Sequence, residues 1–283
     1  MEKLIDGYGL IEGPVWDPKR GLIFSDVVNG GAFCLARDGS VSQVIEHRRG
    51  MGGMALHADG GLIVSGRNIS YKPNGSGPTQ VLLADDPDNG RLGFNDLTTD
   101  AAGRIYAGGL GFRPVGADDE PKPGDLYCID LDGSARAVGH DVMLTNGLGF
   151  SPDGKSLYHS ESLRNLVRVY DVAADGDLSP HRTFAKVEPG VPDGLAVAED
   201  GSVWVAVAHG NRVQVFNPDG TTRAEIPCPL PMVTSLCFGG DDLRTLYVVT
   251  GSDDSGRDNA GTVFQMPVDV PGLPVPPARV RLG

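Results

Sequence analysis

DGLAVAEDGSVWVAVAHGNRVQVFNPDGTTRAEIP, residues 193–227, is the stretch that decides the fold. It contains four short runs with many β-branched or aromatic residues, each bounded by Gly, Asp, Asn or Pro. Runs of this kind are typical of β-strands joined by tight turns. The sequence shows no convincing apolar period of 3.6 residues, so we do not expect long helices. Residues 193–227 therefore predict one unit of four short strands.

The phrase that opens this unit recurs six times along the chain. An opening residue is followed by a small or polar residue, a short apolar stretch and usually a Pro, Asp or Gly turn. The opening residues are Glu12, Gly52, Asn95, Asn146, Asp193 and Thr234. They are 40, 43, 51, 47 and 41 residues apart, a period typical of four-stranded propeller blades. We predict an all-β, six-bladed β-propeller that occupies residues 1–283 as a single domain.

Two terminal segments are available to close the ring of blades. Residues 3–8 and residues 278–282 each have the composition of a short strand. Either segment could supply the outer strand of the last blade, and the sequence does not choose between them. The Pro-rich segment 270–277 follows the last repeat and is expected to cross the surface.

The charge balance limits the partners of the chain. Its 24 Lys and Arg against 37 Asp and Glu give a formal net charge of −13, which argues against nucleic-acid binding because phosphate contacts depend on clustered basic residues. The four cysteines have no CxxC spacing, so no zinc ribbon or redox motif is indicated. The N-terminus has no apolar signal core, and no apolar run reaches membrane-spanning length. We expect a cytoplasmic protein without a membrane partner, and its oligomeric state is not predicted.

Four of the six opening residues carry side-chain oxygens, namely Glu12, Asn95, Asn146 and Asp193. Equivalent positions of a propeller face one another around its axis, so these oxygens are expected to converge. An all-oxygen set suits a hard divalent cation. We expect calcium, with magnesium or manganese as alternatives and zinc as a less natural one. Asn and Asp before Gly are also common turn formers, so the residues alone leave a metal site and a set of turn residues as alternatives.

The second strand of each unit returns to the face that carries the opening residues, so the loops after these strands are expected to surround the site. The two longest loops are residues 108–124 and 251–261, and long loops often carry function. His209, near the end of a second strand, could transfer protons. Arg67 and Arg113, on loops of the same face, could contact an anionic substrate. A structural or solvated role is the alternative for each of these three side chains.

Four segments in order and spacing give the chain its resemblance to a known family. They are EGPVWDPKRGLIFSDV (12–27), FNDLTTDAAGRIYAG (94–108), TNGLGFSPDGKSLY (145–158) and VPDGLAVAEDGSVWVA (191–206). The chain resembles the family of senescence marker protein (regucalcin), gluconolactonases and luciferin-regenerating enzymes over nearly its whole length.

This resemblance implies a six-bladed propeller with one divalent cation in the central tunnel, held by Glu12, Asn146 and Asp193. It implies that Asn95 binds substrate, or reaches the metal directly or through water. Asp193 would also be the general base of lactone hydrolysis. An acidic substrate contact of the family maps to Glu120, in a loop of variable length.

One departure from the family pattern concerns the substrate. Sugar-lactone hydrolases of this kind tend to carry Arg two residues before the substrate Asn, where this chain has Gly93, with Arg91 two residues earlier. Gly93 has no side chain that could bind a polyol, which weakens the prediction of a sugar lactone. We predict a metal-dependent lactonase that acts on a small lactone or ester. Organophosphate or phosphotriester hydrolysis on the same metal site, and non-catalytic calcium or ligand binding, are the alternatives.

Overall fold

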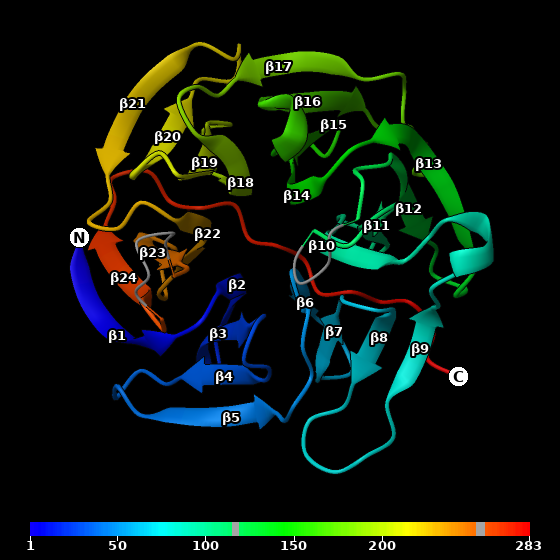
Figure 1. Cartoon of the computed structure of the whole chain (residues 1–283), viewed down its shortest axis with the longest axis horizontal. Helices are drawn as coiled ribbons and strands as arrows, with labels where there is room; N and C mark the ends of the chain where they lie inside the picture. Colours follow the sequence, from blue (N-terminus) through cyan, green and yellow to red (C-terminus); the bar gives the residue numbers. More distant parts are fainter. Residues whose placement is uncertain (115–118, 253–257) are drawn as a thin grey trace.

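The computed structural model describes residues 1–114, 119–252 and 258–283. Its strands form six four-stranded antiparallel sheets that are arranged as blades around a central axis (Figure 1). The predicted all-β, six-bladed β-propeller is therefore confirmed. The first strand of each repeat lies innermost, so the opening residues are brought toward the axis.

The blades are numbered by the repeats that open them. Blades 1 to 3 consist of β2 (Ile11–Asp17), β3 (Gly21–Asp26), β4 (Ala32–Leu35) and β5 (Val41–Ile45); β6 (Met54–Leu56), β7 (Leu62–Val64), β8 (Ile69–Lys72) and β9 (Gln80–Leu83); and β10 (Gly93–Thr99), β11 (Ile105–Leu110), β12 (Gly124–Ile129) and β13 (Ala135–Val142). Blades 4 to 6 consist of β14 (Thr145–Phe150), β15 (Ser156–Glu161), β16 (Leu166–Asp171) and β17 (Arg182–Lys186); β18 (Val191–Val197), β19 (Val203–Ala208), β20 (Arg212–Phe216) and β21 (Thr222–Pro227); and β22 (Val233–Gly239), β23 (Thr245–Thr250), β24 (Gly261–Pro267) and β1 (Glu2–Tyr8). Two short 3-10 helices, η1 (Pro87–Asn89) and η2 (Ser162–Arg164), lie between strands. In the described part of the chain, no helix is long and apolar enough to cross a membrane.

The N-terminal strand closes the ring. β1 pairs antiparallel with β24, with Lys3 opposite Phe264 and Ile5 opposite Val263. The first strand of the chain thus completes the blade built from the last repeat. Of the two terminal segments available from the sequence, the N-terminal one takes this role.

The C-terminal residues 271–281, which we call the strap, cross the ring (Figure 1) and bond to the ends of inner strands that lie away from the opening residues. Leu273 N donates to the carbonyl of Val197 over 2.8 Å, and Ala278 N donates to the carbonyl of Leu56 over 2.8 Å. The strap is therefore attached by its backbone to blades 5 and 2, on either side of the axis.

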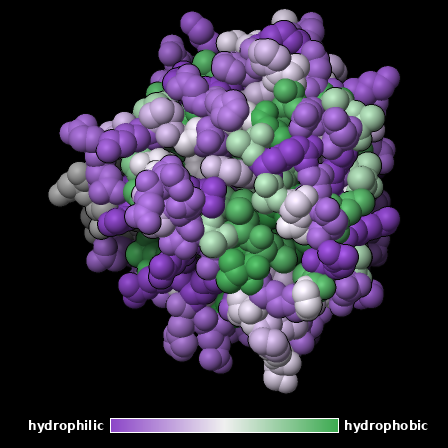
Figure 2. All heavy atoms as spheres, turned by 90° about the vertical axis from the view of Figure 1, so that its right-hand side faces the viewer, coloured by the Kyte–Doolittle hydropathy of each residue, from purple (hydrophilic) through white to green (hydrophobic). Residues whose placement is uncertain are grey.

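Apolar side chains pack the faces of the blades together. On β19, Val203, Val205 and Val207 are fully buried in a cluster shared with blade 4, whereas Trp204 and Ala206 pack in a cluster shared with blade 6. Both faces of the strand are covered, which explains its continuous apolar run. The outer surface differs: Figure 2 shows a mainly hydrophilic side of the ring with one apolar area near its centre.

Candidate functional site

Five of the six opening residues lie at or beside β-bulges in the inner strands. In β2, Glu12 pairs with Ser25 of β3 and Val15 pairs with Ile23, so three residues of β2 advance against two of β3. A one-residue shift at or beside the opening residue also occurs in β10, β14, β18 and β22. Bulges re-aim neighbouring side chains and are frequent next to active sites. This shared irregularity explains how side chains at equivalent repeat positions gather near the axis.

Glu12, Asp96 and Asp193 form an acidic cluster near the axis, in which Asp193 is buried and the other two side chains are half-buried. Burial raises the pKa of Glu12 well above its usual range, and the carboxyl groups of Asp193 and Asp96 raise it further. Burial and the nearby Asp96 carboxyl also raise the pKa of Asp193, and burial raises the pKa of Asp96 to about 7. Without a counter-charge the cluster retains protons, because water cannot solvate the anions and the anions repel one another.

Asp96 is absent from the predicted donor set, although the repeat contains a signal for it. The residues that follow the six opening residues are Gly13, Gly53, Asp96, Gly147, Gly194 and Ser235. Blade 3 alone has a carboxyl group at this position. The inner strands of blades 4, 5 and 6 approach so closely here that a Cβ on Gly147 would overlap the backbone of Leu195, and a Cβ on Gly194 would overlap Ser235. A large side chain directly after the opening residue is therefore an exception. A comparison of the six repeats could have identified Asp96 as that exception.

The two amide side chains predicted at the site contact each other. Asn95 Nδ2 donates to the carbonyl of Thr145 over 2.8 Å and to Asn146 Oδ1 over 2.6 Å. Asn146 Nδ2 donates to Ser162 Oγ over 2.8 Å. These three hydrogen bonds hold both amide groups in one orientation. They use the N–H groups of Asn95 and leave its Oδ1 as an acceptor. That oxygen faces Gly52, where a Cβ would overlap it, so the missing side chain of blade 2 leaves room for Asn95.

The donor set fits a divalent cation by its chemistry. Asp193 is 5% exposed, and its Oδ1 has no hydrogen-bond partner among the described residues. Buried carboxylate oxygens are normally paired or bound to a metal. Within the described residues, no group of three or more His, Cys, Asp or Glu side chains is arranged to hold a metal ion. A cation site here therefore depends on the amide oxygens of Asn146 and Asn95 beside the carboxylates of Glu12 and Asp193.

A buried ion pair supports the segment that precedes Asn146. Glu161 Oε1 and Oε2 accept hydrogen bonds from the backbone N–H groups of Leu144 and Met143 at 2.9 and 3.1 Å. Arg168 Nη2 lies 2.8 Å from Glu161 Oε2, and the two side chains are 1% and 0% exposed. Neither Glu161 nor Ser162 was predicted as a site residue, because their contacts link strands that are distant from the opening phrase in sequence.

The predicted rim residues lie apart from this cluster. Arg113 is exposed and its backbone N–H donates to Asp119 Oδ2 over 3.0 Å. Glu120 is exposed, and His209 is exposed in the turn after β19 with a φ of 58°. In the residues that the structure describes, no hydrogen bond or ion pair joins these side chains to the acidic cluster.

The two predicted long loops are described only in part. Residues 115–118 of the loop 108–124 and residues 253–257 of the loop 251–261 lie outside the described residues. The described ends of both loops follow β11 and β23, the second strands of blades 3 and 6. Their position after second strands agrees with the predicted blade topology.

Gly93 has an arginine on each side, and the two arginines differ in availability. The guanidinium carbon of Arg91 lies 4.9 Å from the ring centre of Tyr127 and 5.8 Å from that of Phe94, so Arg91 is held against the blade. Arg67 is different: its Cα lies 3.6 Å from the position a Cβ would take on Gly93, and its side chain is 81% exposed. Arg67 is thus the more accessible arginine near Gly93, although its Nε donates to Asp85 Oδ2 over 2.9 Å.

A family assignment agrees with this geometry. Residues 10–252, which include all six opening residues, match the model of the SMP-30/gluconolactonase/LRE-like region. The chain belongs to this family. The resemblance predicted from the sequence is therefore confirmed.

Individual relatives cover nearly the whole chain. A 6-deoxy-6-sulfogluconolactonase from Pseudomonas putida is 34% identical over 277 residues, which are 94% of this chain and 93% of the relative. Pentonolactonase XacC from Haloferax volcanii is 30% identical over 289 residues, 96% of this chain and 95% of the relative. Among solved structures, a luciferin-regenerating enzyme has a TM-score of 0.87 at 25% identity and covers 99% of both chains.

Proposed function

We propose that this family member is a lactone hydrolase that depends on a divalent cation. The observation that carries the proposal is the proximity of the carboxyl groups of Glu12 and Asp193, with one buried oxygen of Asp193 that has no hydrogen-bond partner among the described residues. Asn146 holds the equivalent repeat position in blade 4. Two relatives of nearly equal length are named as lactonases, which supports the same class of reaction. Burying two carboxylates together costs free energy that a cation offsets.

Glu12, Asn146 and Asp193 would hold the cation, with calcium as the proposed metal because all of the donors are oxygens. When bound, a divalent cation polarises the lactone carbonyl and stabilises the charge that develops on its oxygen. Binding of the cation also keeps the carboxyl groups ionised, since a nearby positive charge lowers a carboxyl pKa. Magnesium, manganese and zinc are the alternatives that a metal titration compares.

The side chains have separate roles in the proposed reaction. Asp193 accepts a proton from the attacking water as the water oxygen bonds to the carbonyl carbon. The bond from that carbon to the ring oxygen then breaks, the ring oxygen takes up the proton, and the product is a hydroxy acid. Asn95 orients the substrate through Oδ1, because its N–H groups already bond to Thr145 and Asn146.

The relatives favour a sugar lactone as substrate, since their names are those of sugar lactonases. Gly93 contributes no side chain, and we propose that Arg67 takes the place of the arginine missing there. Arg113 and Glu120 are proposed as further contacts for the polar groups of the substrate. His209, on the same face, is proposed as a proton-transfer group.

Lactone hydrolysis followed by pH-stat on metal-stripped and calcium-restored protein tests the proposal. We expect turnover of a sugar lactone only with the restored cation, and loss of turnover in Asp193→Asn. The matched variant Asp153→Asn removes a carboxylate from an exposed turn at the far end of the blade and is expected to behave as the unmodified protein. Calcium binding without metal-dependent turnover of aliphatic, aromatic or sugar lactones would identify a non-catalytic binding protein instead.

A further inference from the structure

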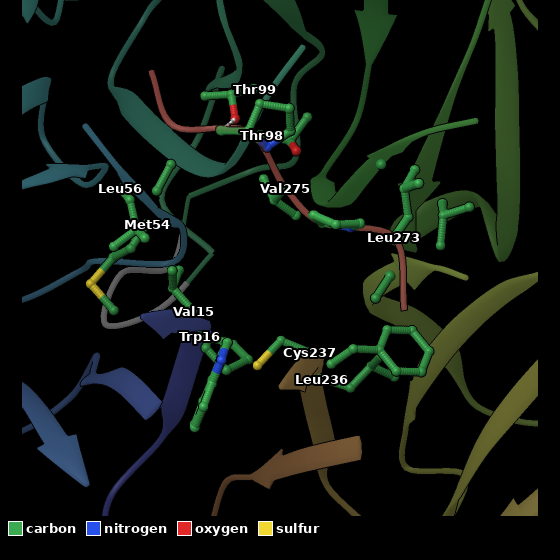
Figure 3. Close-up of a pocket in the computed structure, with 18 of the residues that line it drawn as sticks. Val15, Trp16, Met54, Leu56, Thr98, Thr99, Leu236, Cys237, Leu273 and Val275 are labelled. Atoms are coloured by element: carbon green, nitrogen blue, oxygen red, sulfur yellow. Dashed lines mark hydrogen bonds between the residues drawn. The ribbon is translucent and has the colours of Figure 1, made fainter. Parts of the chain in front are cut away.

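A large cavity occupies the end of the propeller opposite Glu12 and Asp193, with Asp96 at its inner end. Its volume is about 570 Å³, which is within the range of small-molecule sites. Inner strands of all six blades line it, and the strap crosses its mouth (Figure 3). The labelled side chains in that view are Val15, Trp16, Met54, Leu56, Thr98, Thr99, Leu236, Cys237, Leu273 and Val275.

The cavity wall is apolar and offers no cationic group to a ligand. Among the described lining residues, the ionised or acidic side chains are Asp96 at the inner end and Asp241 at the rim, and none of them is Lys, Arg or His. Asp241 already pairs with Arg37 over 2.6 Å. An anionic ligand would therefore enter a site without a counter-charge, which is costly. The wall instead matches an uncharged molecule with an apolar body.

Among the described lining residues, Asp96 is the one that the cavity shares with the acidic cluster. Gly147 of β14 and Gly194 of β18 are the positions where a Cβ would overlap the next strand, so the strands meet at that level. Asp96 lies at the same level, and the cavity begins on its far side. Glu12, Asn146 and Asp193 do not line the cavity. A substrate at the acidic cluster and a ligand in the cavity would occupy different ends of the axis.

The strap limits what can enter. Its backbone bonds to Val197 and Leu56 fasten it on both sides of the mouth, and Thr99 Oγ1 donates to the carbonyl of Pro276 between them. Three of the residues that cross the mouth, Pro274, Pro276 and Pro277, have no backbone N–H. The strap therefore offers few backbone N–H groups with which a strand of another protein could pair. Such a strand would also have to displace the strap to enter the cavity. A small molecule can pass beside it.

We propose that this cavity is a second ligand site, which binds an uncharged and largely apolar small molecule. The body of the ligand packs against Trp16, Leu236 and Cys237 on one side and Val275 of the strap on the other. Any polar group of the ligand faces Asp96 and Thr98 at the inner end. The site is independent of lactone hydrolysis, because no residue proposed to bind the cation or the lactone lines it.

Fluorescence of Trp16 tests the site directly. The chain has two tryptophans, and Trp204 packs against Phe238 between blades 5 and 6, so Trp204→Phe leaves Trp16 as the reporter. The uncharged probe N-phenyl-1-naphthylamine is titrated into this protein, beside its anionic counterpart 1-anilinonaphthalene-8-sulfonate. We expect saturable quenching of Trp16 by the uncharged probe and binding of the anionic probe that is weaker by about tenfold or more.

Blocking variants locate the bound probe. Cys237→Phe fills the cavity from β22, and Val275→Phe fills it from the strap; each is expected to weaken probe binding by about tenfold or more. Val81→Phe is the matched control, since Val81 is 55% exposed on the outer strand β9. Circular dichroism shows which variants remain folded, and the strap variant keeps the test valid if Cys237→Phe does not fold. Equal binding to the blocking variants and to the control, no saturable binding, or equal affinity for the anionic probe would overturn the proposal.

Discussion

The side-chain amide of Asn146 donates to Ser162 Oγ over 2.8 Å, and Ser162 Oγ donates in turn to the carbonyl of Pro192 over 2.6 Å. Ser162 therefore connects the donor of blade 4 to the residue that immediately precedes Asp193, the donor of blade 5. Ser162 is 3% exposed, so water does not replace this bridge. The hydroxyl fixes the amide of Asn146, whose oxygen accepts one hydrogen bond from Asn95 Nδ2 and keeps a second lone pair for the site.

Ser162→Ala removes this bridge and is expected to weaken calcium binding. Loss of a group that orients a metal ligand typically lowers metal affinity on the order of 10- to 100-fold. Isothermal titration of metal-stripped protein with calcium measures the change. At saturating calcium, kcat for lactone hydrolysis is expected to stay near that of the unmodified protein, because Asp193 and Asn95 remain.

Ser160→Ala provides the matched control for this variant. Ser160 is fully buried, and its Oγ has no hydrogen-bond partner in the described structure. Its removal is expected to leave calcium affinity unchanged. If the two alanine variants lose affinity equally, or if Ser162→Ala retains full affinity, Ser162 does not position Asn146.

The inner strands, and the places of the opening residues in them, were predictable because the repeat is local. Glu12, Asn146 and Asp193 hold the same place in phrases that recur with a regular period, and the period alone specifies a blade. The relation of Ser162 to Asn146 was not predictable, since it joins the end of one strand to the start of another through the fold. Asp96 is an intermediate case. The repeat shows an unusual carboxyl residue at this position, but its place beside Glu12 and Asp193 is known only from the three-dimensional structure.

The closing strand shows why local composition can be insufficient. Residues 3–8 and 278–282 both have the composition of a strand, and the structure pairs only the first with β24. The second bonds to β6 and to loops at the far end of the ring, where Ala278 N donates to Leu56 and Arg281 N to Leu131. The preceding prolines lack the N–H groups that a strand ladder requires, which favours a crossing segment over an outer strand.

Glu161→Gln is expected to destabilise the fold strongly. It leaves the buried guanidinium of Arg168 without its counter-charge, and breaking a buried pair by removing one partner costs about 3–5 kcal/mol. Urea unfolding monitored by circular dichroism measures the free energy of unfolding. The double variant Glu161→Gln with Arg168→Met removes the unpaired charge and is expected to recover part of the loss. Unchanged stability of the single variant would show that the pair is not essential to the blade.

His159 is expected to make the fold sensitive to acid. Burial, with contributions from Arg168 and His181, lowers its pKa from 6.5 to about 3. The folded state thus binds this proton more weakly than the unfolded chain does. The neutral His159 therefore does not reduce the free energy of unfolding above pH 6.5, and that free energy falls as the pH declines from 6.5 toward 3. For the unmodified protein, this single group reduces the free energy of unfolding by about 2 kcal/mol between pH 7 and pH 5.

His159→Leu removes this titration and fills a site that is fully buried. Urea unfolding at pH 7 and pH 5 is expected to show a smaller decrease in stability for the variant than for the unmodified protein. His47→Asn is the control, because His47 is exposed and Asn tolerates its φ of 55°. The assignment fails if His159→Leu and His47→Asn show the same pH dependence.

Arg67→Ala is expected to reduce recognition of an anionic sugar lactone. Arg67 lies beside Gly93, is mostly exposed, and has Asp85 as its ion-pair partner at 2.9 Å. A charged hydrogen bond contributes about 1.5–3 kcal/mol, so KM for a sulfonated gluconolactone should rise about tenfold, with a smaller change in kcat. KM for neutral gluconolactone should change less, because it lacks the anionic group. Arg279→Ala removes the same charge from the strap at the opposite end and is expected to leave both KM values unchanged. An equal rise in KM for the neutral and the anionic lactone, or the same effect from Arg279→Ala, would show that Arg67 does not read the charge of the substrate.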